Sequence, residues 1–118
     1  MAVKIVDGEK RLSKLEFVAD EDWATHPRSM YTCPWCSAQI EFALRDLDRH
    51  RGSSFTNLTA ADAEHVSAIA TRSDRDYNDF IDFYCQGCGR PVRICYTAWA
   101  GGRFTYGYKM EFVVEVTS

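Results

Sequence analysis

The chain has 118 residues, of which 46% are hydrophobic and 26% are charged, a balance that excludes wholesale disorder and fits one domain spanning residues 1–118. Fourteen lysines and arginines against seventeen aspartates and glutamates give a formal net charge of −3, which argues against a dedicated duplex nucleic-acid binder. The sequence contains neither a run of ~18 apolar residues nor an apolar secretory region near its start, so we expect a cytoplasmic protein without membrane contact.

The first third of the chain contains one short predicted strand. Residues 3–6 are β-prone and end at the turn-forming pair Asp7-Gly8. Residues 20–30 combine three acidic residues with a His-Pro pair, which predicts a loop or a short helical turn.

The middle of the chain predicts helices. Within residues 37–49, Ile40, Leu44 and Leu47 recur at helical spacing. Because Ile40 also alternates with Phe42 and Leu44, a strand is the alternative, although we favour the helix. A second helix is predicted over about residues 60–71, where Thr59 is a suitable N-cap and Asp62 places a carboxylate in the first turn.

The last third predicts strands over residues 80–84, 92–99 and 104–116, the last two forming a long antiparallel hairpin. Even-numbered residues from Phe104 to Val116 are mostly apolar, whereas Lys109, Glu111 and Glu115 alternate with them. This pattern predicts one face buried in a core and the other in water.

Two Cys-x-x-Cys units, Cys33–Cys36 and Cys85–Cys88, are the strongest chemical pattern in the chain. Zinc takes four ligands in a tetrahedron, and a two-residue spacer lets both thiolates of one tight turn face a single ion. Gly89, directly after the second pair, suits a turn that needs positive φ. We therefore predict one structural Zn²⁺ bound by Cys33, Cys36, Cys85 and Cys88.

The arrangement resembles a zinc ribbon, in which two such knuckles crown β-hairpins and share one zinc. The long stretch between the pairs, residues 37–84, exceeds the common ribbon spacing and implies an inserted segment that would hold one or two helices. The predicted fold is thus α+β: an antiparallel sheet with a long C-terminal hairpin, knuckles at Cys33–Cys36 and Cys85–Cys88, and helices between them.

The two cysteine pairs also allow three other uses. A redox dithiol needs only one pair, disulfides need an oxidising compartment, and a catalytic zinc usually recruits histidine or carboxylate. Each fits less well than a closed four-thiolate site. The fifth cysteine, Cys95, is predicted to be a small buried or half-buried thiol.

No catalytic motif is recognisable, so we expect a binding module and no enzyme. The residues from Cys85 through Arg93 and on to the tyrosine-rich last strand loosely resemble small bacterial zinc-knuckle proteins, some similar to immunity proteins that neutralise a secreted toxin. That resemblance implies a protein partner. The alternatives are a thiol-redox protein or a nucleic-acid-binding zinc ribbon, the latter using basic residues interleaved with aromatic ones: Arg90, Arg93, Arg103, Lys109, Tyr96, Trp99, Tyr106 and Tyr108.

The densest group of carboxylates lies just before the second knuckle and is formed by Asp74, Asp76, Asp79 and Asp82. Such a group complements the basic clefts of toxins that attack nucleic acids. We therefore predict a basic protein partner, such as a toxin domain, bound through these aspartates with Tyr77 and Phe80 as apolar anchors.

Overall fold

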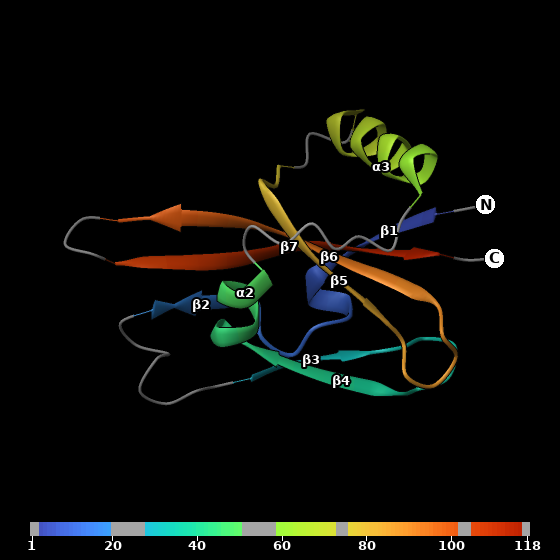
Figure 1. Ribbon diagram of the computed structural model, residues 1–118, viewed down its shortest axis with the longest axis horizontal. Coiled ribbons are helices and arrows are strands. Elements are labelled where there is room, and N and C mark those ends of the chain that lie inside the picture. The colour runs from blue at the N-terminus through green and yellow to red at the C-terminus, as the bar shows by residue number, and fades with distance from the viewer. Residues whose placement is uncertain (1–2, 20–27, 51–58, 73–75, 102–104, 117–118) are drawn as a thin grey trace.

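The computed structural model describes residues 3–19, 28–50, 59–72, 76–101 and 105–116, and Figure 1 shows their arrangement. None of the helices in these ranges combines the length and the apolar character that crossing a bilayer requires. Of the segment predicted as a loop, residues 20–27 lie outside the described ranges, and residues 28–30 belong instead to a strand.

The centre of the molecule is a five-stranded antiparallel sheet. Along its main path the order is β1-β7-β6-β5, and β2 pairs with β7 further along the same edge that β1 occupies. A short 3₁₀ helix, η1, separates β1 from β2. The bounds are β1 (Val3–Asp7), η1 (Gly8–Lys10), β2 (Glu16–Val18), β5 (Asp79–Tyr84), β6 (Pro91–Ala100) and β7 (Tyr106–Val116).

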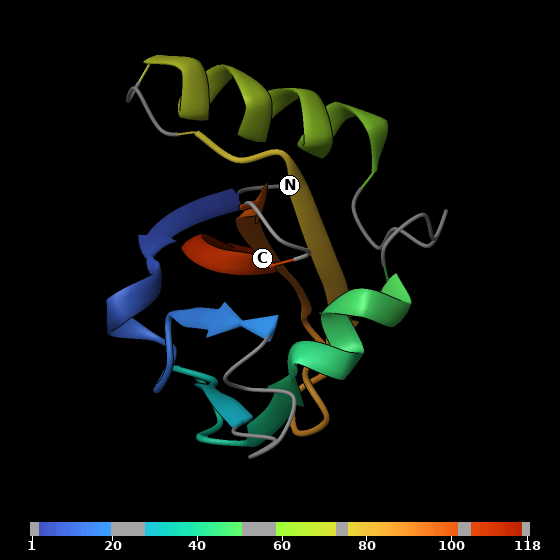
Figure 2. The same cartoon turned by 90° about the vertical axis from the view of Figure 1, so that its left-hand side faces the viewer.

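Different elements cover the two faces of this sheet. On one face lie the two-stranded hairpin of β3 (Arg28–Thr32) and β4 (Gln39–Ala43) and the short helix α2 (Leu44–His50). On the other lies α3 (Ala60–Arg72), so Figure 2 shows three layers with the sheet in the middle. The fold is therefore α+β, as predicted, with α2 and α3 between the two cysteine pairs.

Residues 39–50 combine both structures that the sequence left open. Strand β4 occupies the first part, where Ile40 and Phe42 alternate with exposed residues, and α2 follows from Leu44. The change occurs where the Asp46 carboxylate accepts a hydrogen bond of 2.8 Å from the backbone N–H of Ala43. This contact caps the helix start and ends the strand. The prediction of a helix over all of residues 37–49 was thus wrong for its first half.

Helix α3 forms as predicted. Thr59 Oγ1 accepts a hydrogen bond of 3.1 Å from the N–H of Asp62, which satisfies one of the helix's first backbone donors. Val66 and Ala70, one turn apart, are buried against the sheet. They belong to what we call the helix-side cluster: Val66, Ala70, Cys95, Phe112, Val114 and Val116.

The C-terminal hairpin is present, but its last strand does not keep one face toward water. The pairing of β6 with β7 shifts between Cys95, opposite Phe112, and Tyr96, opposite Met110, so Glu111 is the extra residue of a β-bulge. Beyond the bulge, the alternation changes faces. Phe112 joins the helix-side cluster, whereas Met110 joins the larger hairpin-side cluster, which includes Phe17, Tyr31, Phe42, Leu47, Ile94, Tyr96, Tyr108 and Val113. The predicted position of Phe104 lies outside the described residues.

Glu115 corrects the solvent-face prediction most clearly, because it is fully buried. Its carboxylate accepts a hydrogen bond from the Tyr31 hydroxyl and pairs with Arg11, whose Nε lies 2.9 Å away. The pKa of Tyr31 is raised well above its usual range, mainly because the hydroxyl is buried and secondly because it donates a hydrogen bond to Glu115. This network joins β7 to β3 and to the segment after η1, so charge inside the core is compensated.

Candidate metal centre

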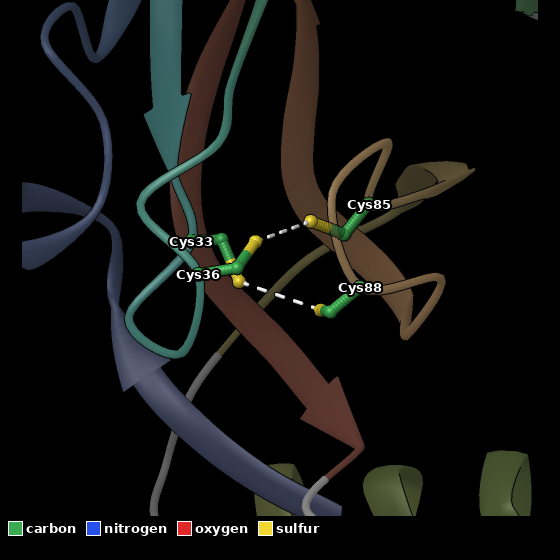
Figure 3. Close-up of side chains that lie close together, drawn as sticks. All are labelled: Cys33, Cys36, Cys85 and Cys88. Carbon is green, nitrogen blue, oxygen red and sulfur yellow. Dashed lines mark hydrogen bonds between the residues drawn. The ribbon is translucent and has the colours of Figure 1, made fainter.

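The four predicted ligands come together in space. Cys33 and Cys36 lie on the loop between β3 and β4, and Cys85 and Cys88 lie on the loop between β5 and β6. Figure 3 shows the two loops facing each other with the sulfur atoms between them. The site thus joins the outer hairpin to the central sheet.

The first loop is held by two backbone hydrogen bonds around Cys33. Its N–H donates to the carbonyl of Ala38 at 2.9 Å, and its carbonyl accepts from the N–H of Ser37 at 3.0 Å. Ser37 has a φ of 63°, which is uncommon for a residue other than glycine. The loop therefore turns sharply enough to point both thiols the same way.

The second loop repeats this conformation. The N–H of Cys85 donates to the carbonyl of Arg90 at 2.9 Å, and its carbonyl accepts from the N–H of Gly89 at 2.8 Å. Gly89 has a φ of 76°, as its place after the second pair predicted. Two segments far apart in the sequence thus form the same knuckle.

The sulfur positions suit a tetrahedral ion. All four lie within 4.8 Å of one another, with 3.8 Å between Cys33 and Cys88 and 3.4 Å between Cys36 and Cys85. Four thiolates at the usual Zn–S distance would lie about 3.8 Å apart. The two short contacts join sulfurs across the knuckles, which fits one shared ion better than two separate redox pairs.

Gly87 is the residue of the site that sequence reasoning missed. A Cβ atom at this position would lie 2.6 Å from Cys36 Sγ and 2.9 Å from the Cβ of Ala38. Only glycine therefore lets the two knuckles approach this closely. The glycine inside the second Cys-x-x-Cys unit was visible in the sequence, but only the three-dimensional arrangement shows what it faces.

The site has a buried side and a surface side. Cys33 and Cys85 are buried, whereas Cys36 and Cys88 are exposed. Hydrogen bonds from Arg90 lower the pKa of Cys88 to about 6. The bond from the Arg90 backbone N–H contributes most, and the bond from its side chain comes second. The Arg90 guanidinium also lies 4.6 Å from the centre of the Trp35 ring, so one cation links the knuckles and offsets negative charge on the thiolates.

Cys95 is separate from this site. It lies fully buried in the helix-side cluster, and burial raises the pKa of its thiol to about 12. The prediction of a buried thiol is confirmed.

The predicted partner surface is only partly assembled. Asp74 lies outside the described residues, and the side chain of Asp82 is buried, with 2.7 and 2.9 Å hydrogen bonds from Arg93. Asp82 is therefore an internal counter-ion and is not available to a partner. Asp76 is exposed, whereas Asp79, Tyr77 and Phe80 are half-buried and line one groove together with Asp76.

The residues of the nucleic-acid alternative do not form one surface. Arg93, Tyr96 and Tyr108 are buried, and Arg103 lies outside the described residues. Lys109 is exposed, whereas Trp99 and Tyr106 are half-buried. The interleaving in the sequence thus reflects alternation between a core and a surface.

Comparison with family profiles, with curated proteins and with solved structures found no match.

Proposed function

We propose that this chain is a non-catalytic protein-binding module whose fold is held by one structural zinc ion at Cys33, Cys36, Cys85 and Cys88. The observation that carries the proposal is the pair of matching knuckles with their four sulfur atoms at tetrahedral spacing. Four thiolates would close the coordination shell, which is typical of structural zinc and leaves no position for a substrate.

A zinc ion here would add a cross-link between the outer hairpin and the central sheet, beyond the apolar cluster and the Tyr31–Glu115 hydrogen bond that they already share. The hairpin of β3 and β4 forms its own two-stranded sheet, and such a hairpin is marginally stable alone. Because a preformed site is rare in an unfolded chain, metal-binding energy, of order 10 kcal/mol in small zinc peptides, becomes folding energy.

Metal analysis of protein purified without added metal tests this proposal. We expect one zinc per chain, and we expect a chelator or the substitution Cys85→Ser to unfold the protein or lower its melting temperature sharply. Cys95→Ser is the matched control, which should keep its zinc and cost about 1–2 kcal/mol through its buried position. A folded protein without metal, or equal damage from both substitutions, would refute the structural role.

The partner we propose is a protein with a basic surface, and an immunity protein acting on a nucleic-acid-degrading toxin is the specific form of this role. The support is the acidic balance of the chain and the absence of a recognisable catalytic motif in its sequence. Purified protein mixed with the product of the adjacent gene should form a stoichiometric complex and inhibit its nuclease activity. Full nuclease activity with no complex would remove the toxin-inhibitor role.

A further inference from the structure

A groove of about 460 Å³ separates the C-terminal half of α3 from the chain segment that enters β5. This volume lies within the range of small-ligand sites, about 300–1,000 Å³. The side chains that matter for its chemistry are Ser67 and Thr71 from α3 and Asp76, Tyr77, Asp79 and Phe80 from the β5 side.

The β5 side of the groove is firmly fixed. The side chain of Asn78 accepts a hydrogen bond of 2.7 Å from the N–H of Ala98 and donates one of 2.9 Å to its carbonyl. The ring of Tyr77 packs edge-on against buried Phe112, with the ring centres 5.3 Å apart. A ligand would therefore meet a wall that is already ordered, which reduces the entropy lost on binding.

The groove combines negative charge with aromatic surface. Asp76 is exposed and Asp79 half-buried, and neither forms an ion pair with any other described residue. One oxygen of Asp79 accepts the N–H of Phe80 at 2.8 Å. The half-buried rings of Tyr77 and Phe80 each follow one of the two carboxylates directly in the sequence and line the same groove.

This combination suits a long side chain with an apolar stem and a planar cationic end. Carboxylates bind a guanidinium with two parallel hydrogen bonds, and aromatic rings stack on it. The Arg93 guanidinium already lies 3.8 Å from the centre of the Phe80 ring, so a ligand in the groove would meet the ring of Tyr77 or the other face of Phe80.

We propose that this groove is the docking site for an arginine side chain presented by the protein partner. The inference rests on the proposed function, that the chain binds a protein with a basic surface. It adds the location of the binding site and the partner side chain that enters it. Strand β5 runs from the groove to Cys85, so the metal centre fixes the far end of the strand that supplies the acidic wall.

The test uses zinc-loaded full-length protein and the peptide acetyl-Gly-Ser-Arg-Ser-Gly-amide, followed by amide chemical shifts in NMR. The control peptide carries citrulline, which has the same shape without the charge, in place of arginine. We expect saturable shifts at Tyr77, Asn78 and Phe80 with the arginine peptide, and shifts at least threefold smaller with citrulline or at about 0.5 M salt.

The double variant Asp76→Asn/Asp79→Asn should weaken arginine-peptide binding at least threefold, because asparagine keeps the size and the acceptor to Phe80 while removing the charge. Glu9→Gln/Glu16→Gln makes the same change in net charge at exposed positions on η1 and β2 and should bind as the parent does. Equal binding of both peptides, binding unaffected by the aspartate variant, or no saturable shift in the groove would each overturn the inference.

The same samples separate this inference from the proposed function. Groove binding by a folded protein without zinc would refute the structural zinc and leave the inference standing. A zinc-loaded module that inhibits its partner equally well with Asp76→Asn/Asp79→Asn would refute the inference and leave the proposed function standing.

Discussion

The two faces of the central sheet are held by different kinds of interaction. On one face, α3 is held by apolar contacts, with Val66 and Ala70 buried against β7. On the other, the β3–β4 hairpin shares the hairpin-side cluster, and it is also held by the cysteine site at its tip and by the Tyr31–Glu115 hydrogen bond close to that tip. Stability on the hairpin side should therefore depend on metal, whereas stability on the helix side should depend on side-chain volume.

After the loss of a zinc ligand, the largest single-residue effect should come from a buried ion pair that lies in neither the helix nor the metal site. Asp82→Asn leaves the Arg93 guanidinium buried without its counter-charge, and we expect it to lower the free energy of unfolding by about 3–5 kcal/mol. The double variant Asp82→Leu/Arg93→Met should lose much less, because it removes both charges together. Urea unfolding of the three proteins measures this, and a loss below about 0.5 kcal/mol for Asp82→Asn would contradict it.

On the helix side of the sheet, removing side-chain volume should lower the stability of the fold without changing how tightly zinc is held. Val66→Ala leaves a cavity under α3, and we expect a loss of about 2 kcal/mol in urea unfolding. The rate at which folded protein gives up zinc to a competing chelator should stay unchanged. His65→Ala, at the exposed neighbouring position, should change stability by less than about 0.5 kcal/mol. Equal losses from the two substitutions would show that α3 does not pack as described.

On the hairpin side, adding volume at the knuckle should act through the metal. Gly87→Ala places a methyl group against Cys36 Sγ, so we expect at least tenfold weaker zinc binding, or about 1.4 kcal/mol. Gln86→Ala changes the exposed neighbour and should bind zinc as the parent does. Competition with a chromophoric chelator measures both variants, and parental affinity for Gly87→Ala would show that the knuckles are further apart.

The smallest effect that we predict is the order in which the cysteine thiols react, and it involves no change in stability. During slow alkylation of the zinc-loaded protein followed by mass spectrometry, we expect exposed Cys36 and Cys88 to be modified first. Cys95 should be modified last, because it is fully buried, which excludes the reagent and also raises the pKa of its thiol to about 12. Early modification of Cys95 would mean that the helix side opens more readily than the hairpin side.

The sequence was most informative where one local pattern determines the outcome. The Cys-x-x-Cys spacing, the glycine at 89 and the Thr59 cap each depend on a few neighbouring residues, and the structure contains all three features. The C-terminal hairpin was also recognisable, because period-two alternation persists along its last strand.

The sequence was least informative where contacts between residues far apart in the chain determine which side chains are buried or paired. The bulge at Glu111 leaves the alternation of residue types intact while moving Phe112 to the opposite face from Met110. Glu115 looked solvent-facing because its partners, Arg11 and Tyr31, come from remote segments. Asp82 looked like part of an acidic surface because its pairing with Arg93 follows from the register of β5 on β6.

The central claim is that both knuckles share one zinc ion, and X-ray absorption at the zinc edge of the purified protein tests it most directly. We expect a single shell of four sulfur atoms at about 2.3 Å from the zinc, with one zinc per chain by metal analysis. A shell containing nitrogen or oxygen, or two sulfurs per zinc with two ions per chain, would contradict it.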